Sequence, residues 1–162
     1  PEDASVNQLS RHAVLVAFVG LTLATTAAAQ SERPMLGPQA GFATNSFDLL
    51  VGAQLSYQVA PQIDIYPSFD VYFPSGGSAW SLNANGRYWP KLNMPNPGLY
   101  VGGGLGITHI SSGGFGTTKA GLNLLGGWEF HASNLRPFAE LRAILASNVD
   151  RIEFVGGINF KL

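Results

Sequence analysis

The 162-residue sequence contains no cysteine and few charged residues. The absence of cysteine excludes disulfide bonds, thiolate metal sites and membrane attachment through a lipidated cysteine. Charged residues make up 12% of the chain, whereas soluble domains carry about 25%. A formal net charge of −1 with no basic cluster argues against a nucleic-acid partner. The three histidines, His12, His109 and His131, show no metal-ligand spacing, and no phosphate-binding motif precedes a helix, so we expect neither a metal nor a cofactor.

The first thirty residues differ from the rest of the chain. Arg11 and His12 precede an apolar run over residues 13–23, and three alanines follow at residues 27–29. This order is typical of a secretory signal peptide. The alternative, a membrane anchor, needs about 20 apolar residues. We therefore expect residues 1–29 to form a signal-peptide helix that is removed, which leaves residues 30–162 as one domain.

The stretch Asp48–Phe73 sets the pattern for that domain. Apolar and polar residues alternate on both sides of a turn at residues 60–62, which predicts a β-hairpin with one apolar and one polar face. The same alternation predicts further strands over residues 37–43, 78–89, 98–110, 117–131, 137–146 and 151–162. We expect residues 31–36 to be loose, and turns at residues 44–47, 74–77, 111–116, 132–136 and 147–150. This gives eight strands in up-and-down order.

The polar face carries all the charges of these segments. They comprise six acids and five bases: Asp48, Asp64, Asp70, Glu129, Glu140, Glu153, Arg87, Lys119, Arg142, Arg151 and Lys161. On the apolar face the only titratable residue is His109. Otherwise the polar face consists mainly of Gly, Ser, Asn, Gln and Tyr, a composition that fits an enclosed lumen better than a solvated surface. The alternative is a soluble calyx with its apolar face inward.

Aromatic residues on the apolar face lie near the strand ends, as in the interfacial girdles of membrane proteins. They are Tyr57, Phe73, Trp80, Tyr88, Trp128, Phe130 and Phe160. Strands of about ten residues match a tilted membrane-spanning strand. Since backbone groups in lipid must be paired internally, the sheet has to close. The sequence therefore predicts an all-β fold, an eight-stranded antiparallel up-and-down transmembrane β-barrel.

Several motifs resemble those of the small outer-membrane β-barrel family that includes the OmpA/OmpX-type proteins. They are residues 98–106, residues 136–141 and the C-terminal end. Gly157, Phe160 and Leu162 are similar to the insertion signal read by the outer-membrane assembly machinery, with Leu162 in place of the usual aromatic residue. The resemblance implies an outer-membrane location, contact with outer-membrane lipid and lipopolysaccharide, passage through assembly machinery and periplasmic chaperones, and a monomer.

Charged residues on the lumen face of neighbouring strands predict an ion-pair network. Its members are Asp70, Arg87, Glu129, Glu140, Arg142, Glu153 and Lys161, with Asp70 and Arg87 expected to pair across adjacent strands. We interpret it as a structural network that fills the barrel, because an unpaired enclosed charge is costly. The alternative is a gated proton or ion path. The lumen side of the predicted strand at residues 98–110 lacks side chains at Gly102, Gly104 and Gly106. Either large neighbouring side chains fill this gap, or it is a small cavity that holds a ligand or water.

A catalytic alternative involves His131, Ser133 and Glu140, whose pattern resembles that of outer-membrane lipid A deacylases. Such a set would supply a base, a nucleophile and an orienting acid. However, the spacing to Glu140 is shorter than in that family, and the motif falls in a predicted periplasmic turn. The leading hypothesis is a non-catalytic barrel with a structural, envelope role and a narrow or closed polar lumen. The alternatives are a small barrel that binds or transports a hydrophobic ligand, and the esterase.

Overall fold

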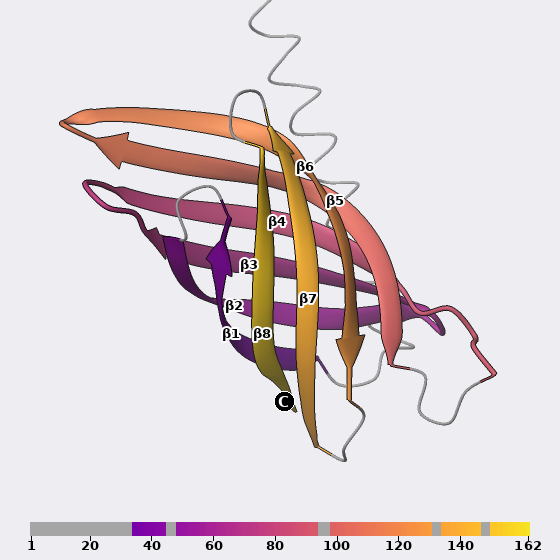
Figure 1. Ribbon diagram of the computed structural model, residues 1–162. Helices are drawn as coiled ribbons and strands as arrows, with labels where there is room; N and C mark the ends of the chain where they lie inside the picture. The colour runs from indigo at the N-terminus through magenta and orange to yellow at the C-terminus, as the bar shows by residue number, and fades with distance from the viewer. Residues whose placement is uncertain (1–33, 45–47, 94–97, 131–133, 147–149) are drawn as a thin grey trace, which may run out of the picture. The chain divides into compact units, whose positions relative to one another are not determined.

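The computed structural model describes residues 34–44, 48–93, 98–130, 134–146 and 150–162 (Figure 1). The predicted signal peptide, residues 1–29, lies outside these ranges. The strands are β1 (Met35–Ala43), β2 (Asp48–Ala60), β3 (Ile63–Phe73), β4 (Ser78–Tyr88), β5 (Leu99–Ser112), β6 (Phe115–Glu129), β7 (Leu135–Ala146) and β8 (Arg151–Lys161). Among the described residues no helix is long and apolar enough to span a membrane.

The eight strands form one closed antiparallel barrel, which confirms the predicted fold class. Each strand pairs with the next along the chain, and β8 returns to pair with β1. The closing pair brings Phe42 opposite Phe154 and Leu36 opposite Phe160. Because every strand has two neighbours, the sheet has no free long edge.

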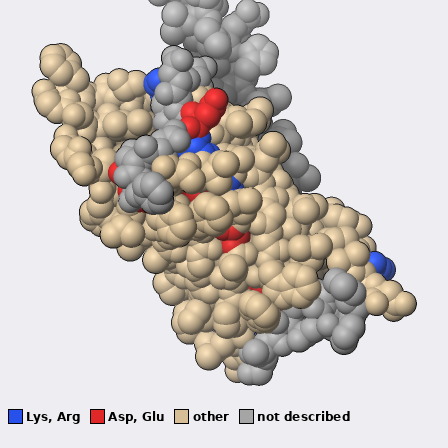
Figure 2. All heavy atoms as spheres, viewed as in Figure 1, with Lys and Arg blue, Asp and Glu red and all other residues tan. Residues whose placement is uncertain are grey.

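Alternation places polar side chains inside and apolar side chains outside. In β3, for example, Tyr66 and Asp70 are buried whereas Ile65 and Phe69 are exposed. Large apolar side chains stay exposed around the barrel, among them Leu49 and Leu105, each 65% exposed. The face shown in Figure 2 is accordingly mostly uncharged. This arrangement is the reverse of a soluble barrel, whose apolar side chains fill the interior.

Several predicted boundaries were wrong, among them the turn at residues 132–136, since β7 already begins at Leu135. The expected turn at residues 111–116 is mostly strand: β5 runs to Ser112 and β6 starts at Phe115, so only Gly113 and Gly114 form the turn. Their φ angles of +59° and +84° are those of a two-residue hairpin turn, which favours glycine. The segment expected to be loose at residues 31–36 contributes Met35 and Leu36 to β1, because both pair with β2 and β8.

Candidate functional site

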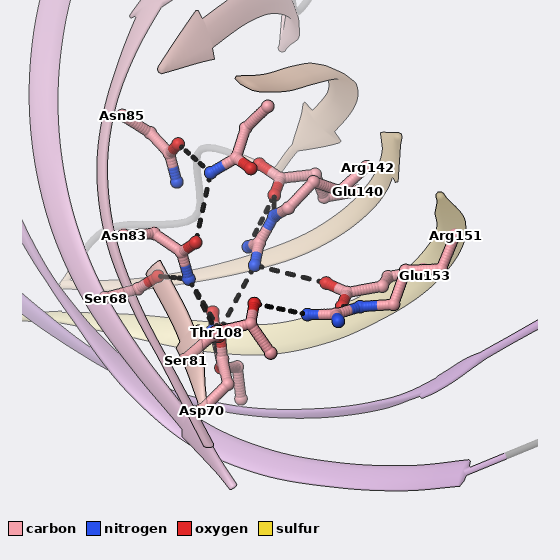
Figure 3. A network of polar contacts seen from close by, with 12 residues as sticks. Ser68, Asp70, Ser81, Asn83, Asn85, Thr108, Glu140, Arg142, Arg151 and Glu153 are labelled. Carbon is pink, nitrogen blue, oxygen red and sulfur yellow. Dashed lines mark hydrogen bonds and ion pairs between the residues drawn. The ribbon is translucent and has the colours of Figure 1, made fainter. Parts of the chain in front are cut away.

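The lumen is filled by a network of charged and polar side chains, and Arg142 of β7 lies at one of its two centres. The Arg142 guanidinium is fully buried and forms ion pairs at 2.8 Å with Glu140, 3.2 Å with Asp70 and 3.4 Å with Glu153. Glu140 lies on the same strand, and Glu153 lies opposite Arg142 on β8. Asp70 comes from β3, on the far wall of the barrel, and Figure 3 shows Arg142 reaching across the lumen to it.

Arg151 extends this cluster toward the β7–β8 turn. Its Nε donates to Glu153 at 2.7 Å, and its Nη2 donates to Tyr72 at 2.9 Å and to Thr108 at 3.3 Å. The Tyr72 hydroxyl in turn donates to Glu153 at 2.8 Å. Glu153 therefore receives hydrogen bonds from three side chains, Arg142, Tyr72 and Arg151. These donors satisfy the buried carboxylate from within the lumen.

The second centre is Arg87 of β4, nearer the end of the barrel where β1 begins and β8 ends. Arg87 forms ion pairs with Asp64 at 3.2 Å and Glu129 at 3.6 Å. Its guanidinium carbon also lies 5.0 to 5.2 Å from the centres of three aromatic rings, those of Tyr66, Trp89 and Tyr100. Rings at this distance attract a cation electrostatically. Arg87 is thus held both by carboxylates and by an aromatic cage.

Glu140 joins the two centres. Its Oε2 accepts hydrogen bonds from the hydroxyls of Tyr66, at 2.9 Å, and Tyr100, at 3.0 Å, while its Oε1 binds Arg142. The same tyrosine rings contact Arg87. Amides complete the network: Gln54 donates to Asn159, which in turn donates to Glu129. Gln39 of β1 donates to Asp70. Since these groups come from all eight strands, the network ties the barrel wall together from inside.

The glycines of β5 leave room for this network. A Cβ on Gly104 or Gly106 would collide with the side-chain oxygen of Asn85 or Asn83. Both asparagines accept hydrogen bonds from Asn123, at 2.9 Å and 3.1 Å (Figure 3). The space beside these glycines is therefore occupied by neighbouring side chains, the first of the two alternatives.

Six of the seven residues predicted for the ion-pair network are buried in the lumen: Asp70, Arg87, Glu129, Glu140, Arg142 and Glu153. Lys161 is exposed near the end of β8, opposite Met35. The expected pairing of Asp70 with Arg87 was wrong. Asp70 lies opposite Ser81 and Arg87 lies opposite Asp64, so Asp70 binds Arg142 instead.

Sequence reasoning missed five members of the network: Asp64, Tyr66, Tyr72, Tyr100 and Arg151. All five lie on the predicted polar face. Their position in the alternation of polar and apolar residues was therefore the signal that could have identified them. Arg136 was also missed, because it had been assigned to a turn; it lies in β7 and contacts Glu129 at 3.7 Å. Tyrosines on the polar face of a barrel strand are a signal for internal hydrogen bonding to carboxylates.

The predicted aromatic residues lie toward the two ends of the barrel wall. Phe73 and Trp80 are at one end, and the others are at the end where β1 begins and β8 ends. Phe73, Trp80, Tyr88, Phe130 and Phe160 are exposed, and Tyr57 and Trp128 are half-buried. In the C-terminal motif, Phe160 faces outward, and Gly157 lies under the ring of Phe138, which a Cβ would approach to 2.6 Å.

The predicted catalytic set is not assembled within the described residues. His131 and Ser133 lie outside them, and Glu140 is already bound to Arg142, Tyr66 and Tyr100. In the part of the chain that the structure describes, no three His, Cys, Asp or Glu side chains are grouped to hold a metal ion. The arrangement is that of an internally neutralised polar core.

Comparison with known proteins identifies the fold. No protein-family model and no curated protein matches the sequence. The structure is similar to the N-terminal β-barrel domain of Pseudomonas aeruginosa OprF, with a TM-score of 0.67 and 17% identity over 82% of this chain and 100% of that one. It is also similar to Neisserial surface protein A (NspA), with a TM-score of 0.64 and 17% identity over 82% of this chain and 99% of that one. The chain therefore has the fold of the small eight-stranded outer-membrane β-barrels, as the sequence motifs had predicted.

Proposed function

We propose that the protein is an integral outer-membrane barrel with a structural, envelope role, a closed polar lumen and no catalytic activity. The observation that carries this proposal is the inverted distribution of side chains. Exposed apolar residues such as Leu49, Leu105 and Leu124 cover the barrel wall, and ionised residues fill the interior. Contiguous apolar surface on a soluble monomer rarely exceeds a few hundred Å², and a lipid bilayer is the surrounding that this wall fits.

Closure of the lumen follows from the position of Arg142. Its guanidinium joins carboxylates from β3, β7 and β8, and both Arg142 and its partner Glu153 are fully buried. A hydrated ion crossing this level would have to separate these pairs in an interior where unpaired charges are costly. We therefore expect the folded wild-type barrel to conduct no ions.

The remaining parts of the proposal concern delivery and partners. We propose export by the N-terminal signal at residues 1–29, insertion by the assembly machinery through the Gly157, Phe160 and Leu162 motif, and contact with outer-membrane lipid and lipopolysaccharide. The fold supports these steps because small outer-membrane barrels share it. The esterase alternative gains no support, since the buried Glu140 is committed to the lumen network.

Refolding tests the proposal. Residues 30–162 are refolded from denaturant into detergent micelles, into lipid vesicles and into plain buffer. We expect β-sheet circular dichroism and a heat-dependent shift in gel mobility only with detergent or lipid, and no ion leak from vesicles that contain the folded barrel. A soluble monomeric sheet in buffer would contradict the membrane assignment, and a steady leak would contradict the closed lumen alone.

A further inference from the structure

A groove that is separate from the lumen network lies on the outer wall of the barrel. It has a volume of about 810 Å³ and crosses the wall from β1 over β8, β7 and β6 to β5. Small outward-facing residues form its floor: Ala40, Gly156, Ala139 and Gly126. The register aligns three of them, because Gly156 lies directly between Ala40 and Ala139 on the neighbouring strands.

Large apolar side chains form the two walls of the groove. On one side the rings of Phe42 and Phe154 stack with centres 5.0 Å apart, and Leu141 continues this wall. On the other side stand Leu99 and Trp128, which lie opposite each other on β5 and β6. A trough with small residues below and aromatic and leucine side chains beside it is lined almost wholly by hydrocarbon.

The glycines in the floor are not required by the packing of the chain itself. A Cβ built on Gly156 would lie 3.7 Å from the nearest atom, the carbonyl oxygen of Phe138. One built on Gly126 would lie 3.7 Å from the carbonyl oxygen of Tyr100. Both are ordinary contacts. Glycine weakens a strand and often marks a place where a ligand approaches the backbone closely. In the floor of the groove, these two glycines leave the backbone open to an approach from outside the barrel.

We propose that the groove is a binding site for a single acyl chain of a phospholipid. This rests on the proposed membrane location, because the groove is continuous with the exposed apolar belt that would face lipid. Leu99 is the first residue of β5 and Trp128 is near the end of β6, so this part of the groove opens toward the end of the barrel where β1 begins and β8 ends. The acyl chain therefore enters the groove from the leaflet on that side. This is the phospholipid leaflet if that end of the barrel faces the periplasm.

A second copy of the protein fits the groove less well. Two barrels in one membrane related by a twofold axis along its normal present the same surface to each other. Groove would then face groove and enclose a void, and packed interfaces do not tolerate such voids. A flexible hydrocarbon chain fills the trough without this problem, and its 810 Å³ lies within the range of about 300–1,000 Å³ typical of ligand sites.

The test fills the groove and leaves the rest of the wall unchanged. Gly156→Leu places a side chain in the floor, where a Cβ is tolerated. Gly86→Leu is the matched control: Gly86 also faces outward, on β4, its Cβ would lie 3.7 Å from the carbonyl oxygen of Asp64, and it does not line the groove. All three proteins are refolded into phosphatidylethanolamine vesicles, extracted in mild detergent and washed, and the retained phospholipid is measured by mass spectrometry.

We expect the wild type and Gly86→Leu to retain phospholipid in a one-to-one ratio, and Gly156→Leu to retain about tenfold less, since the lost contacts with several methylenes are additive. Equal retention by all three, or none by the wild type, would overturn the proposal, as would a wild-type dimer that Gly156→Leu converts to a monomer. The heat-dependent mobility shift separates the two proposals. Folded barrels that retain no lipid refute only the groove site, whereas barrels that fail to fold in vesicles refute the membrane location as well.

Discussion

At the residue scale, Arg142 is the group on which the interior depends most. Its side chain is the only described cation that the ion pairs join to Asp70 and Glu140, and it also binds Glu153. Removing one member of a buried ion cluster leaves its partners uncompensated, and this costs more than the pair contributes when it is intact. The lumen charges therefore act as a unit, and single changes should have large effects.

Arg142→Met tests this dependence. Methionine keeps much of the side-chain volume but leaves the three carboxylates of Asp70, Glu140 and Glu153 without their shared cation. We expect the free energy of unfolding to fall by about 3–5 kcal/mol, measured by urea denaturation in micelles. The matched control is Lys91→Met, which removes an exposed cation and should change stability by less than about 0.5 kcal/mol. Similar losses in both variants would show that the lumen cluster has no special role.

Tyr66 and Tyr100 provide a second test, because both hydroxyls donate to the same oxygen of Glu140. Either tyrosine alone still satisfies that oxygen after the other is changed to phenylalanine. We expect each single change to cost about 0.5–1.5 kcal/mol, and the double change Tyr66→Phe with Tyr100→Phe to cost more than the sum. Urea denaturation of the four proteins forms a double-mutant cycle. Strict additivity would mean that the two hydrogen bonds are independent.

At the element scale, strands and faces were predictable and contacts across the barrel were not. Strict alternation in Ile63–Phe73 fixes the face of Asp64, Tyr66 and Asp70, because side chains alternate with period two. The partner of Asp70, however, is Arg142, four strands away on the opposite wall. Such pairs depend on how the sheet closes and how its strands are staggered, which a single sequence does not show.

Glycine-rich segments are where strand boundaries were misread. The cluster at residues 111–116 resembled a loop, yet only Gly113 and Gly114 turn the chain. Gly116 stays in β6. In barrel strands, glycine can leave room for a large side chain on a neighbouring strand. A high frequency of glycine therefore does not distinguish a turn from a strand here.

Two adjacent glycines of β6 separate these uses. Gly127 faces inward, where a Cβ would approach the ring of Tyr100 to 2.5 Å; Gly126 faces outward, where the nearest atom would lie at 3.7 Å. We expect Gly127→Ala to destabilise the barrel by about 1–3 kcal/mol through overpacking. Gly126→Ala should be neutral or stabilise it by up to about 1 kcal/mol. The midpoints of urea unfolding compare the two directly, and the reverse order would show that the assignment of faces in β6 is incorrect.

At the scale of the whole molecule, the polar network inside the barrel and the apolar wall outside it depend on each other. The closed sheet encloses the charged and polar side chains of the interior, and it exposes an apolar wall that suits hydrocarbon better than water. Composition points in this direction before any pairing is known, because charged residues make up 12% of the chain, whereas soluble domains carry about 25%. What the protein does beyond this was not readable from sequence, since the groove of the outer wall combines residues from five strands.

A charged side chain placed on the outer wall tests the whole arrangement, because it destabilises the barrel in lipid and has little effect in water. Leu105 lies midway along β5 and is 65% exposed. In a bilayer, Leu105→Arg should lower the free energy of unfolding by about 2–4 kcal/mol, the cost of an arginine near the midplane on a lipid-facing strand. In water, the same change at an exposed site would be nearly neutral.

Phe115→Arg is the matched control for Leu105→Arg. Phe115 is 85% exposed and begins β6 beside the Gly113–Gly114 turn, in the part of the hairpin that precedes the first pair between β6 and β7, Gly121 with Ala146. Because this position lies at the tip of the longest hairpin, beyond the wall, an arginine there should cost about 1 kcal/mol or less. Reversible unfolding in phospholipid vesicles measures both. Equal costs for the two variants would mean that the wall around Leu105 does not face hydrocarbon, and both the membrane location and the acyl-chain site would then be lost.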